Sequence, residues 1–294
     1  MLKRTRKLQN LQNGFLMSTT ARWRIYIQIT FIRIQIIIPR KYLVEKKTNI
    51  AKDIVDVTYP DFTKNYTTES YLRERAILTP TNAIVDEVNF HVLNLIPGIT
   101  HSYLSQDSID TETGNDDNDY ESSFPIEYLN SINMPSIPKH YLKLKVEAIV
   151  ILMRNLNQIM GLCNGTRMVL TKCLKNSVEC QLLTGSHAGT KVLIPRIEME
   201  PTDTHFPFVF NRIQFPLQIC FTMTIKKSQG QSLQTVGLFL PRPAFSHGQL
   251  YVVISRVTSP DGLHILIEGD NGETCNFTAN VVFDEVFYNL PVSV

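Results

Sequence analysis

The sequence is poor in cysteine, and the cysteines that it has are not grouped. Among 294 residues there are 5 cysteines, and no two of them stand in a C-x-x-C arrangement. An odd count without metal-site spacing argues against a zinc ribbon and against a disulfide framework, and it favours a reducing compartment. The 7 histidines show no metal-ligand spacing either, so no metal site is predicted.

Long apolar runs are absent, and so is one phosphate-binding motif. No apolar run reaches the roughly 18 residues that a membrane helix needs, and the longest, Ile25–Ile38, is interrupted by Arg33. We therefore predict no membrane contact. The pair Gly-Lys occurs nowhere, so the G-x-x-x-x-G-K-[ST] loop that cradles nucleotide phosphates is missing from these residues.

Charge is balanced in total and uneven along the chain. Residues 1–44 contain nine Lys and Arg and no acid, which is typical of an organelle transit peptide. An exposed basic arm and a misassigned gene start remain alternatives. Residues 105–127 contain eight acids and no Lys or Arg, which predicts a solvated acidic loop. Residues 139–260 contain 14 basic and 5 acidic residues, a net charge of 14 − 5 = +9, which indicates a basic working surface.

Strand and helix patterns predict an α/β domain that is interrupted by a small β module. Arg75–Pro80 reads as a buried strand, Thr81 or Asn82 can cap a following helix, and Pro97 and Gly98 end that helix. The expected buried positions of the helix are Ile84, Val88, Val92 and Leu95. Further strands are expected at Leu217–Thr224, Val236–Leu240 and Leu263–Ile267, and four short strands between 142 and 197 predict a small barrel.

Two polar stretches of the α/β part could carry chemistry. In Phe221–Leu233 a buried strand opens into hydroxyls, amides, two lysines and Gly230, which suits contact with phosphate, although an ordinary polar loop with a helix cap has the same composition. In Ser246–Arg256, Ser246 can cap an apolar helix that ends at Arg256. The guanidinium could stabilise a transferring phosphoryl group or only complement the helix dipole.

The two stretches together resemble a known protein family. Thr222–Leu233 resembles the fifth motif of the Pif (petite integration frequency) family of DNA helicases, and Gln249–Arg256 resembles the sixth. Glu74–Asn82 resembles the fourth motif, and 144–167 is similar to the β module that is inserted in this family. The resemblance runs from about Tyr59 to Ile267 in the family's order, and it is nearest to the plant branch with helitron-type transposon relatives.

The resemblance implies a RecA-like second motor lobe, 2A, of the P-loop NTPase type, with an inserted SH3-like β-barrel, 2B. We expect 2A at 59–126 and 201–270 and 2B at 127–200, between a poorly defined basic segment at 1–58 and a tail at 271–294. The implied activity is that of the C-terminal part of an ATP-dependent 5′-to-3′ DNA helicase, with roles in DNA repair, recombination and telomere maintenance, in the nucleus or the mitochondrion.

The resemblance also implies site residues. The expected contacts to single-stranded DNA are Thr79, Thr81, Asn82, Thr224, Lys226, Lys227 and Ser228. Gln229 and Gly230 are expected on the ATP side, and Arg256 is expected to act as an arginine finger. ATP and Mg²⁺ belong to the complete enzyme, and we expect this chain alone to bind neither and to be inactive, because the first lobe with its phosphate loop is missing.

The sequence departs from the family pattern at three places. Lys226 stands where the family usually has Asn or His, Glu147 where it has Gly, and Val253-Ile254 where it has Ala-Leu. Two segments, Ala83–Glu87 and Val281–Glu285, imitate a magnesium-binding acid after an apolar run, and we interpret both as solvent-facing acids.

Two functions of different classes remain open. The first is a second helicase lobe that acts with a first lobe supplied in trans. The second is a non-catalytic module that binds single-stranded nucleic acid, or a decaying transposon-derived remnant, which the +9 region and the β module would also support.

Overall fold

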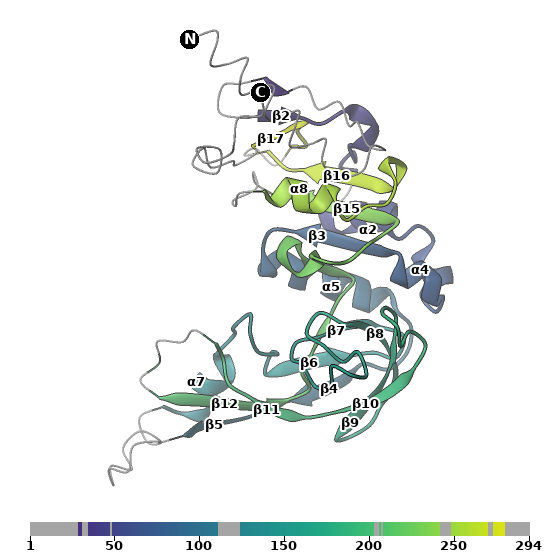
Figure 1. The fold of residues 1–294 in the computed structure, drawn as a ribbon. Coiled ribbons are helices and arrows are strands. Elements are labelled where there is room, and N and C mark those ends of the chain that lie inside the picture. Colours follow the sequence, from purple (N-terminus) through teal and green to yellow (C-terminus); the bar gives the residue numbers. More distant parts are fainter. Residues whose placement is uncertain are drawn as a thin grey trace, which may run out of the picture.

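A computed structural model describes residues 29–30, 35–47, 49–110, 124–202, 206, 208–241, 248–269 and 273–279. A four-stranded parallel sheet with its helices forms one part, and a β-rich part that interrupts it in the chain forms the other (Figure 1). None of the helices in these ranges is long and apolar enough to cross a membrane.

The parallel sheet has the strand order β14-β3-β15-β16. Its strands are β14 (Thr222–Thr224), β3 (Arg75–Thr79), β15 (Thr235–Leu240) and β16 (Leu263–Ile267). They are almost wholly buried, as expected for parallel strands covered on both faces. Helices α2 (Ile50–Thr58) and α5 (Asn82–Leu95) contact this sheet and each other. The predicted RecA-like α/β class is confirmed.

The shorter helices complete the lobe. They are η1 (Arg40–Tyr42), α3 (Phe62–Asn65), α4 (Glu69–Arg73), η2 (Ile225–Ser228), α8 (Gln249–Ile254) and η3 (Pro260–Gly262). The polar turn after β14 is therefore a 3-10 turn, and it contacts α8. The predicted cap of α8, Ser246, lies outside the described residues, and Gly248 occupies the position before the helix.

Helix α5 is rotated slightly from the face that its sequence pattern predicts. Val88 and Val92 are buried as expected, but Leu95 is 36% exposed and Ile84 only partly buried. Val85 and Leu93 are buried instead. The prediction for Leu95 was wrong because Ile96, just beyond the last turn, occupies the core position at this end.

Residues from before position 59 contribute to the main core. Ile38 and Tyr42 are buried in the main core, and the Val44 amide donates to the Ile265 carbonyl of β16 at 2.8 Å. Strands β1 (Ile29–Thr30), β2 (Gln35–Ile37) and β17 (Phe277–Ala279) form a three-stranded sheet. The predicted domain boundaries at residues 58 and 271 stay predictions. Ile38 and Tyr42, which precede residue 58, nevertheless pack in the same core as the parallel sheet.

The interrupting part, called the insertion below, spans His101–Ile219. Its largest sheet has the order β10-β9-β8-β7-β13 and is antiparallel throughout. The strands are β7 (Ile149–Leu152), β8 (Arg167–Cys173), β9 (Ser177–Leu182), β10 (Lys191–Pro195) and β13 (Leu217–Ile219). This sheet and the strands beside it enclose a second apolar core, as a small barrel requires.

The remaining strands of the insertion pair in two smaller sheets. They are β4 (His101–Leu104) with β6 (Tyr141–Leu144), and β5 (Gln106–Asp110), β11 (Ile197–Met199) and β12 (Val209–Gln214), beside helix α7 (Ile126–Ser131). Strands before 127 and after 200 pair with strands of the insertion, and the predicted bounds of 127–200 for the 2B module stay a prediction. The predicted strand Leu217–Thr224 is in fact two strands, β13 in the insertion and β14 in the lobe.

A buried arginine joins the insertion to the lobe. Arg167 of β8 is 1% exposed. Its Nη2 donates to the carbonyls of Leu72 and Arg75, at 3.2 and 2.8 Å, and its Nη1 donates to that of Arg73 at 3.1 Å. Hydrogen bonds from a charged donor are each worth about 1.5–3 kcal/mol, so this contact fixes the barrel on the end of α4 and the start of β3.

Asn89 of α5 forms hydrogen bonds to the segment through which the chain passes from the insertion back to the lobe. Its Nδ2 donates to the carbonyls of Ile219 and Thr222, at 2.8 and 2.9 Å, and its Oδ1 accepts from the Thr222 amide at 2.8 Å. Only Cys220 and Phe221 lie between β13 and β14, and both are fully buried. The chain therefore passes from one core to the other without a loose linker.

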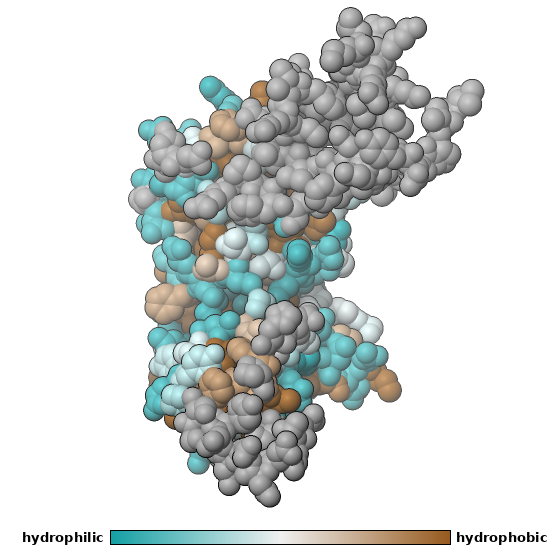
Figure 2. All heavy atoms as spheres, turned by 90° about the vertical axis from the view of Figure 1, so that its left-hand side faces the viewer, coloured by the Kyte–Doolittle hydropathy of each residue, from teal (hydrophilic) through white to brown (hydrophobic). Residues whose placement is uncertain are grey.

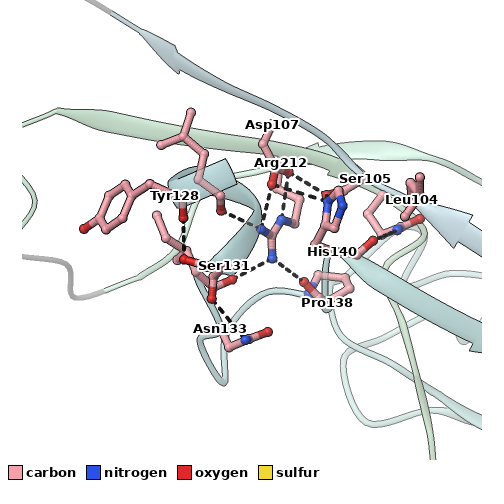
Figure 3. A network of polar contacts seen from close by, with 12 residues as sticks. Leu104, Ser105, Asp107, Tyr128, Ser131, Asn133, Pro138, His140 and Arg212 are labelled. Carbon is pink, nitrogen blue, oxygen red and sulfur yellow. Dashed lines mark hydrogen bonds and ion pairs between the residues drawn. The ribbon is translucent and has the colours of Figure 1, made fainter. Parts of the chain in front are cut away.

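Part of the acidic stretch is buried rather than solvated. Asp107 of β5 and Arg212 of β12 form a two-pronged ion pair, Nε to Oδ1 at 2.8 Å and Nη2 to Oδ2 at 2.7 Å (Figure 3). Both side chains are 0% exposed. Arg212 also donates to the carbonyls of Leu129, Ile132 and Pro138. For Asp107, the prediction of a solvated loop was wrong, because a cation 105 positions later compensates its charge.

Candidate functional site

The predicted DNA-side residues gather at one edge of the parallel sheet. Thr79 and Thr224 are the last residues of β3 and β14, and their Cα atoms are paired in the register of these strands. Thr81 and Asn82 follow β3 at the start of α5, and η2 follows β14. The carboxyl ends of parallel strands meet at one edge, which is where open α/β sheets usually bind ligands.

These residues differ in their exposure. Asn82 and Lys226 are exposed, and Thr81 and Thr224 are partly buried. The Thr79 hydroxyl is buried and has no hydrogen-bond partner among the described residues. The Lys227 ammonium donates to Gln218 Oε1 at 2.7 Å, and burial lowers its pKa below the usual lysine value. Lys226 is therefore the lysine of this turn whose charge faces solvent most fully.

Ser228 has a structural function in the turn. Its hydroxyl is 0% exposed and donates to the Ile225 carbonyl at 2.7 Å, which closes the 3-10 turn. A direct contact of this hydroxyl with DNA would require that bond to open. Gln229 and Gly230 follow as exposed residues. Gly230 has φ of 80°, a left-handed conformation that glycine adopts without strain.

Arg256 lies beside the same turn. Its Nη1 donates to the Gln231 carbonyl at 3.3 Å, its Nε to the Val252 carbonyl at 3.2 Å, and its Nη2 to Ser255 Oγ at 2.9 Å. The Leu233 amide in turn donates to the Arg256 carbonyl at 2.9 Å. All three acceptors of the guanidinium are neutral, so these bonds orient the positive charge without neutralising it.

One of the two acidic segments that imitate a magnesium site is described by the structure. Ala83–Glu87 lies in α5, where Asp86 forms an ion pair with Lys139 at 2.7 Å. Val281–Glu285 lies outside the described residues. Within the described part of the chain, no group of three or more His, Cys, Asp or Glu side chains is arranged to hold a metal ion.

A groove of about 570 Å³ lies between α5 and the insertion, and no residue pattern predicted it. Asn82 and Lys227 line one end of it, and Phe90, Tyr141 and Lys143 line it farther along. On the face shown in Figure 2, apolar and polar side chains mix in the lower part of the molecule, where the insertion lies. No sequence signal could have found the groove, because its residues come from separate elements of the chain.

A protein-family comparison matches the β-rich part. The family model described as DNA helicase Pif1, 2B domain, matches residues 127–173. The ATP-dependent DNA helicase PIF1 of Xenopus laevis is 30% identical over 182 residues, which are 62% of this chain and 26% of that protein. Over these residues the chain is similar to the Pif1 helicases. The human PIF1 helicase is 36% identical over 126 residues, 42% of this chain and 19% of its own length.

Solved Pif1 structures have a similar fold. The Pif1 helicase of Candida albicans superposes with a TM-score of 0.50 at 25% identity, over 73% of this chain and 51% of that one. A Bacteroides Pif1 in complex with ADP-AlF3 and ssDNA superposes with a TM-score of 0.51 at 19% identity, over 82% and 53%, and shows the fold alone. The chain thus spans about a quarter of the Xenopus protein and about half of the solved chains. The plant and helitron assignment stays a prediction.

Proposed function

We propose that this chain is the second motor lobe, with its inserted 2B module, of an ATP-dependent 5′-to-3′ DNA helicase of the nucleus or the mitochondrion. The observation that carries the proposal is the shared edge of the parallel sheet. There the ends of β3 and β14, the start of α5 and the η2 turn bring six of the seven predicted DNA-side residues to one edge, and five of the six are exposed or partly exposed, whereas Thr79 is buried. Ser228, the seventh, supports the turn from within.

The other side of the η2 turn suits the terminal phosphate of a nucleotide. Arg256 donates only to neutral acceptors, and a Cβ built on Gly230 would meet nothing within 4 Å, so an anion can approach both. We propose that ATP and Mg²⁺ are held mainly by a first lobe, which contributes the phosphate loop and the metal-binding acids. Bound ATP would supply the bond that breaks, and Arg256 would neutralise charge on its outer phosphoryl group.

The arginine finger can be tested in a fusion of this chain to the first lobe of a Pif1 helicase. An arginine finger is worth about 10³–10⁵ in rate, so Arg256→Ala should abolish most DNA-stimulated ATP turnover. Arg256→Lys should rescue little, because it keeps the charge and loses the planar fork. The matched control is Arg73→Ala, since Arg73 also ends a short helix and is exposed.

If the fusion hydrolyses ATP and the Arg256→Ala form stays within a factor of about 3 of it, Arg256 is only a helix-end charge. If Arg73→Ala lowers ATP turnover as much as Arg256→Ala does, Arg256 likewise has no specific role as an arginine finger.

A non-catalytic module for single-stranded DNA is the second candidate, and the net charge of +9 over residues 139–260 favours it. Both functions predict binding to single-stranded DNA that weakens with salt. Only the first predicts that adding a separate Pif1 first lobe restores ATP hydrolysis in trans.

A further inference from the structure

The end of α8 carries an inference that rests on the proposed role of Arg256 and adds the residue that holds its side chain. The last carbonyls of a helix have no partner within the helix. Here the Val252 carbonyl accepts two hydrogen bonds from the residues that follow α8, from Ser255 Oγ at 2.8 Å and from Arg256 Nε at 3.2 Å. One backbone oxygen thus anchors both side chains.

The Ser255 hydroxyl has a fixed direction. A hydroxyl has one hydrogen to donate and two lone pairs that accept. The Val252 carbonyl takes the hydrogen, so the lone pairs face the guanidinium, and Arg256 Nη2 donates to Ser255 Oγ at 2.9 Å. Val252, Ser255 and Arg256 therefore form a closed ring of three hydrogen bonds at the end of the helix.

This ring leaves part of the guanidinium available to a ligand. An arginine side chain has five N–H groups, and a third one of Arg256, on Nη1, donates to the Gln231 carbonyl at 3.3 Å. One N–H on each terminal nitrogen then has no partner among the described residues. Two such groups on one planar head can bind two oxygens of a phosphoryl group together, if the head is held in one orientation.

Hydrogen bonds, more than packing, have to hold this head. Ser255 is exposed and Arg256 is only partly buried, so the surrounding side chains do not enclose the long arginine side chain. A free arginine samples many rotamers, and each bond to a fixed acceptor removes some of that freedom before the reaction begins. Among the three acceptors, Ser255 Oγ belongs to a side chain, so a substitution can remove it alone.

We propose that Ser255 is a positioning residue for the arginine finger. Its hydroxyl holds the guanidinium of Arg256 in the orientation that meets the outer phosphoryl group of ATP, and it does not itself touch the nucleotide. A role only in capping α8 would need the bond to Val252 and no more. The two roles differ in one respect, because the effect of a positioning residue depends on the presence of Arg256.

The test uses the full chain fused to the first lobe of a Pif1 helicase and measures DNA-stimulated ATP turnover. Ser255→Ala should lower kcat by about 3–10-fold, the worth of one hydrogen bond, and should leave the KM for ATP within about twofold. Ser255→Thr keeps the hydroxyl and should stay within about twofold of the wild type in kcat. The matched control is Ser131→Ala, because Ser131 also ends a short helix and its hydroxyl donates to the carbonyl three residues earlier, that of Tyr128.

A double-mutant cycle separates positioning from capping. In the Arg256→Ala fusion, whose low rate is read from single turnovers of radiolabelled ATP, Ser255→Ala should cause no further loss beyond about twofold. If Ser255→Ala lowers the rate by the same factor with and without Arg256, or if Ser131→Ala lowers it equally, the hydroxyl acts through general stability and the inference is overturned.

The failure of this inference can be told from the failure of the proposed function. If Arg256→Ala abolishes turnover and Ser255→Ala matches the wild type in kcat, the positioning role is wrong and the arginine finger stands. If Arg256→Ala itself stays within a factor of about 3 of the wild type, the arginine finger falls and the positioning role falls with it.

Discussion

Replacing Glu147 by glycine should stabilise the protein, although it removes a side chain. Glu147 has φ of 70° in the turn between β6 and β7. The Ala148 amide donates to the Lys145 carbonyl at 3.1 Å, so Glu147 is the third residue of a four-residue turn, a position at which a type II turn takes glycine. The Glu147 amide also donates to the Leu170 carbonyl at 2.8 Å, so the turn cannot relax to negative φ without losing that bond.

Two effects of known sign determine the size of the change. A residue with a Cβ costs about 1–2 kcal/mol in the left-handed region, and glycine costs roughly 0.4–1 kcal/mol through the greater freedom of the unfolded chain. Glu147→Gly should therefore gain about 0.5–1 kcal/mol in the free energy of unfolding. The loss of the carboxylate adds to this gain, because burial, and to a smaller extent Glu69, raises the pKa of Glu147.

The pH dependence of the free energy of unfolding separates the effect of backbone strain at Glu147 from the effect of its carboxylate charge. A carboxyl whose folded pKa lies above its unfolded pKa costs stability when it is ionised, and this cost disappears as pH falls through these two values. Glu147→Gln keeps the strain and removes the charge, so it should be more stable than the wild type at pH 7 and equal to it near pH 3.5. Glu147→Gly should be more stable than the wild type at both pH values.

Urea unfolding followed by circular dichroism at both pH values measures these differences. Leu174→Gly, at an exposed loop position of the same module, controls for the general cost of glycine. A Glu147→Gly variant that is no more stable than the wild type at pH 3.5 would refute the strain, and Glu147→Gln equal to the wild type at pH 7 would refute the charge effect.

Three further predictions follow from contacts described above. Arg212→Met should lower the free energy of unfolding by about 3–5 kcal/mol, measured by urea unfolding, because it leaves Asp107 buried without its cation, and a loss under 1 kcal/mol would contradict that account. Lys226→Ala should reduce the slope of log affinity for DNA against log salt by up to about 0.7, and Lys227→Ala should reduce it less. The reason is that burial lowers the pKa of Lys227 and that its ammonium is bound to Gln218. Equal effects of the two substitutions would refute this ranking. The chain alone should release no phosphate from ATP in a coupled assay with single-stranded DNA, and turnover in the usual range of ~1–100 s⁻¹ would contradict the assignment of the phosphate loop to another lobe.

The sequence predicted the features that depend on local pattern. β3, β15 and β16 stand where short apolar runs predicted strands, because these strands are buried on both faces, and α5 stands where its helical spacing and the breakers after it predicted a helix. The DNA-side residues were named from the family resemblance, and the fold then places Thr79 and Thr224 at one carboxyl edge because β3 and β14 are parallel neighbours. The family resemblance supplied which motif belongs to which edge, and pattern alone would not have done so.

The features that the sequence did not predict depend on contacts between distant residues. Leu217–Thr224 has no glycine, proline or charged residue, so nothing local shows that its two halves belong to different sheets. Asp107 looks solvated among its acidic neighbours, and only the fold brings Arg212 to it. The groove is similar, since Phe90 and Tyr141 lie in an α-helix and a β-strand that share no pattern.

The short return between β13 and β14 has a mechanical consequence. Cys220 and Phe221 are buried, Asn89 grips the strands on either side of them, and Arg167 fastens the barrel at a second point. Because the barrel is attached to the lobe both by Asn89 and by Arg167, with only two residues between β13 and β14, we expect it to move together with the lobe. A force on its outer surface would then displace β14 and the η2 turn that follows it. In the proposed helicase, a load on the insertion would therefore displace Lys226, the exposed lysine of that turn.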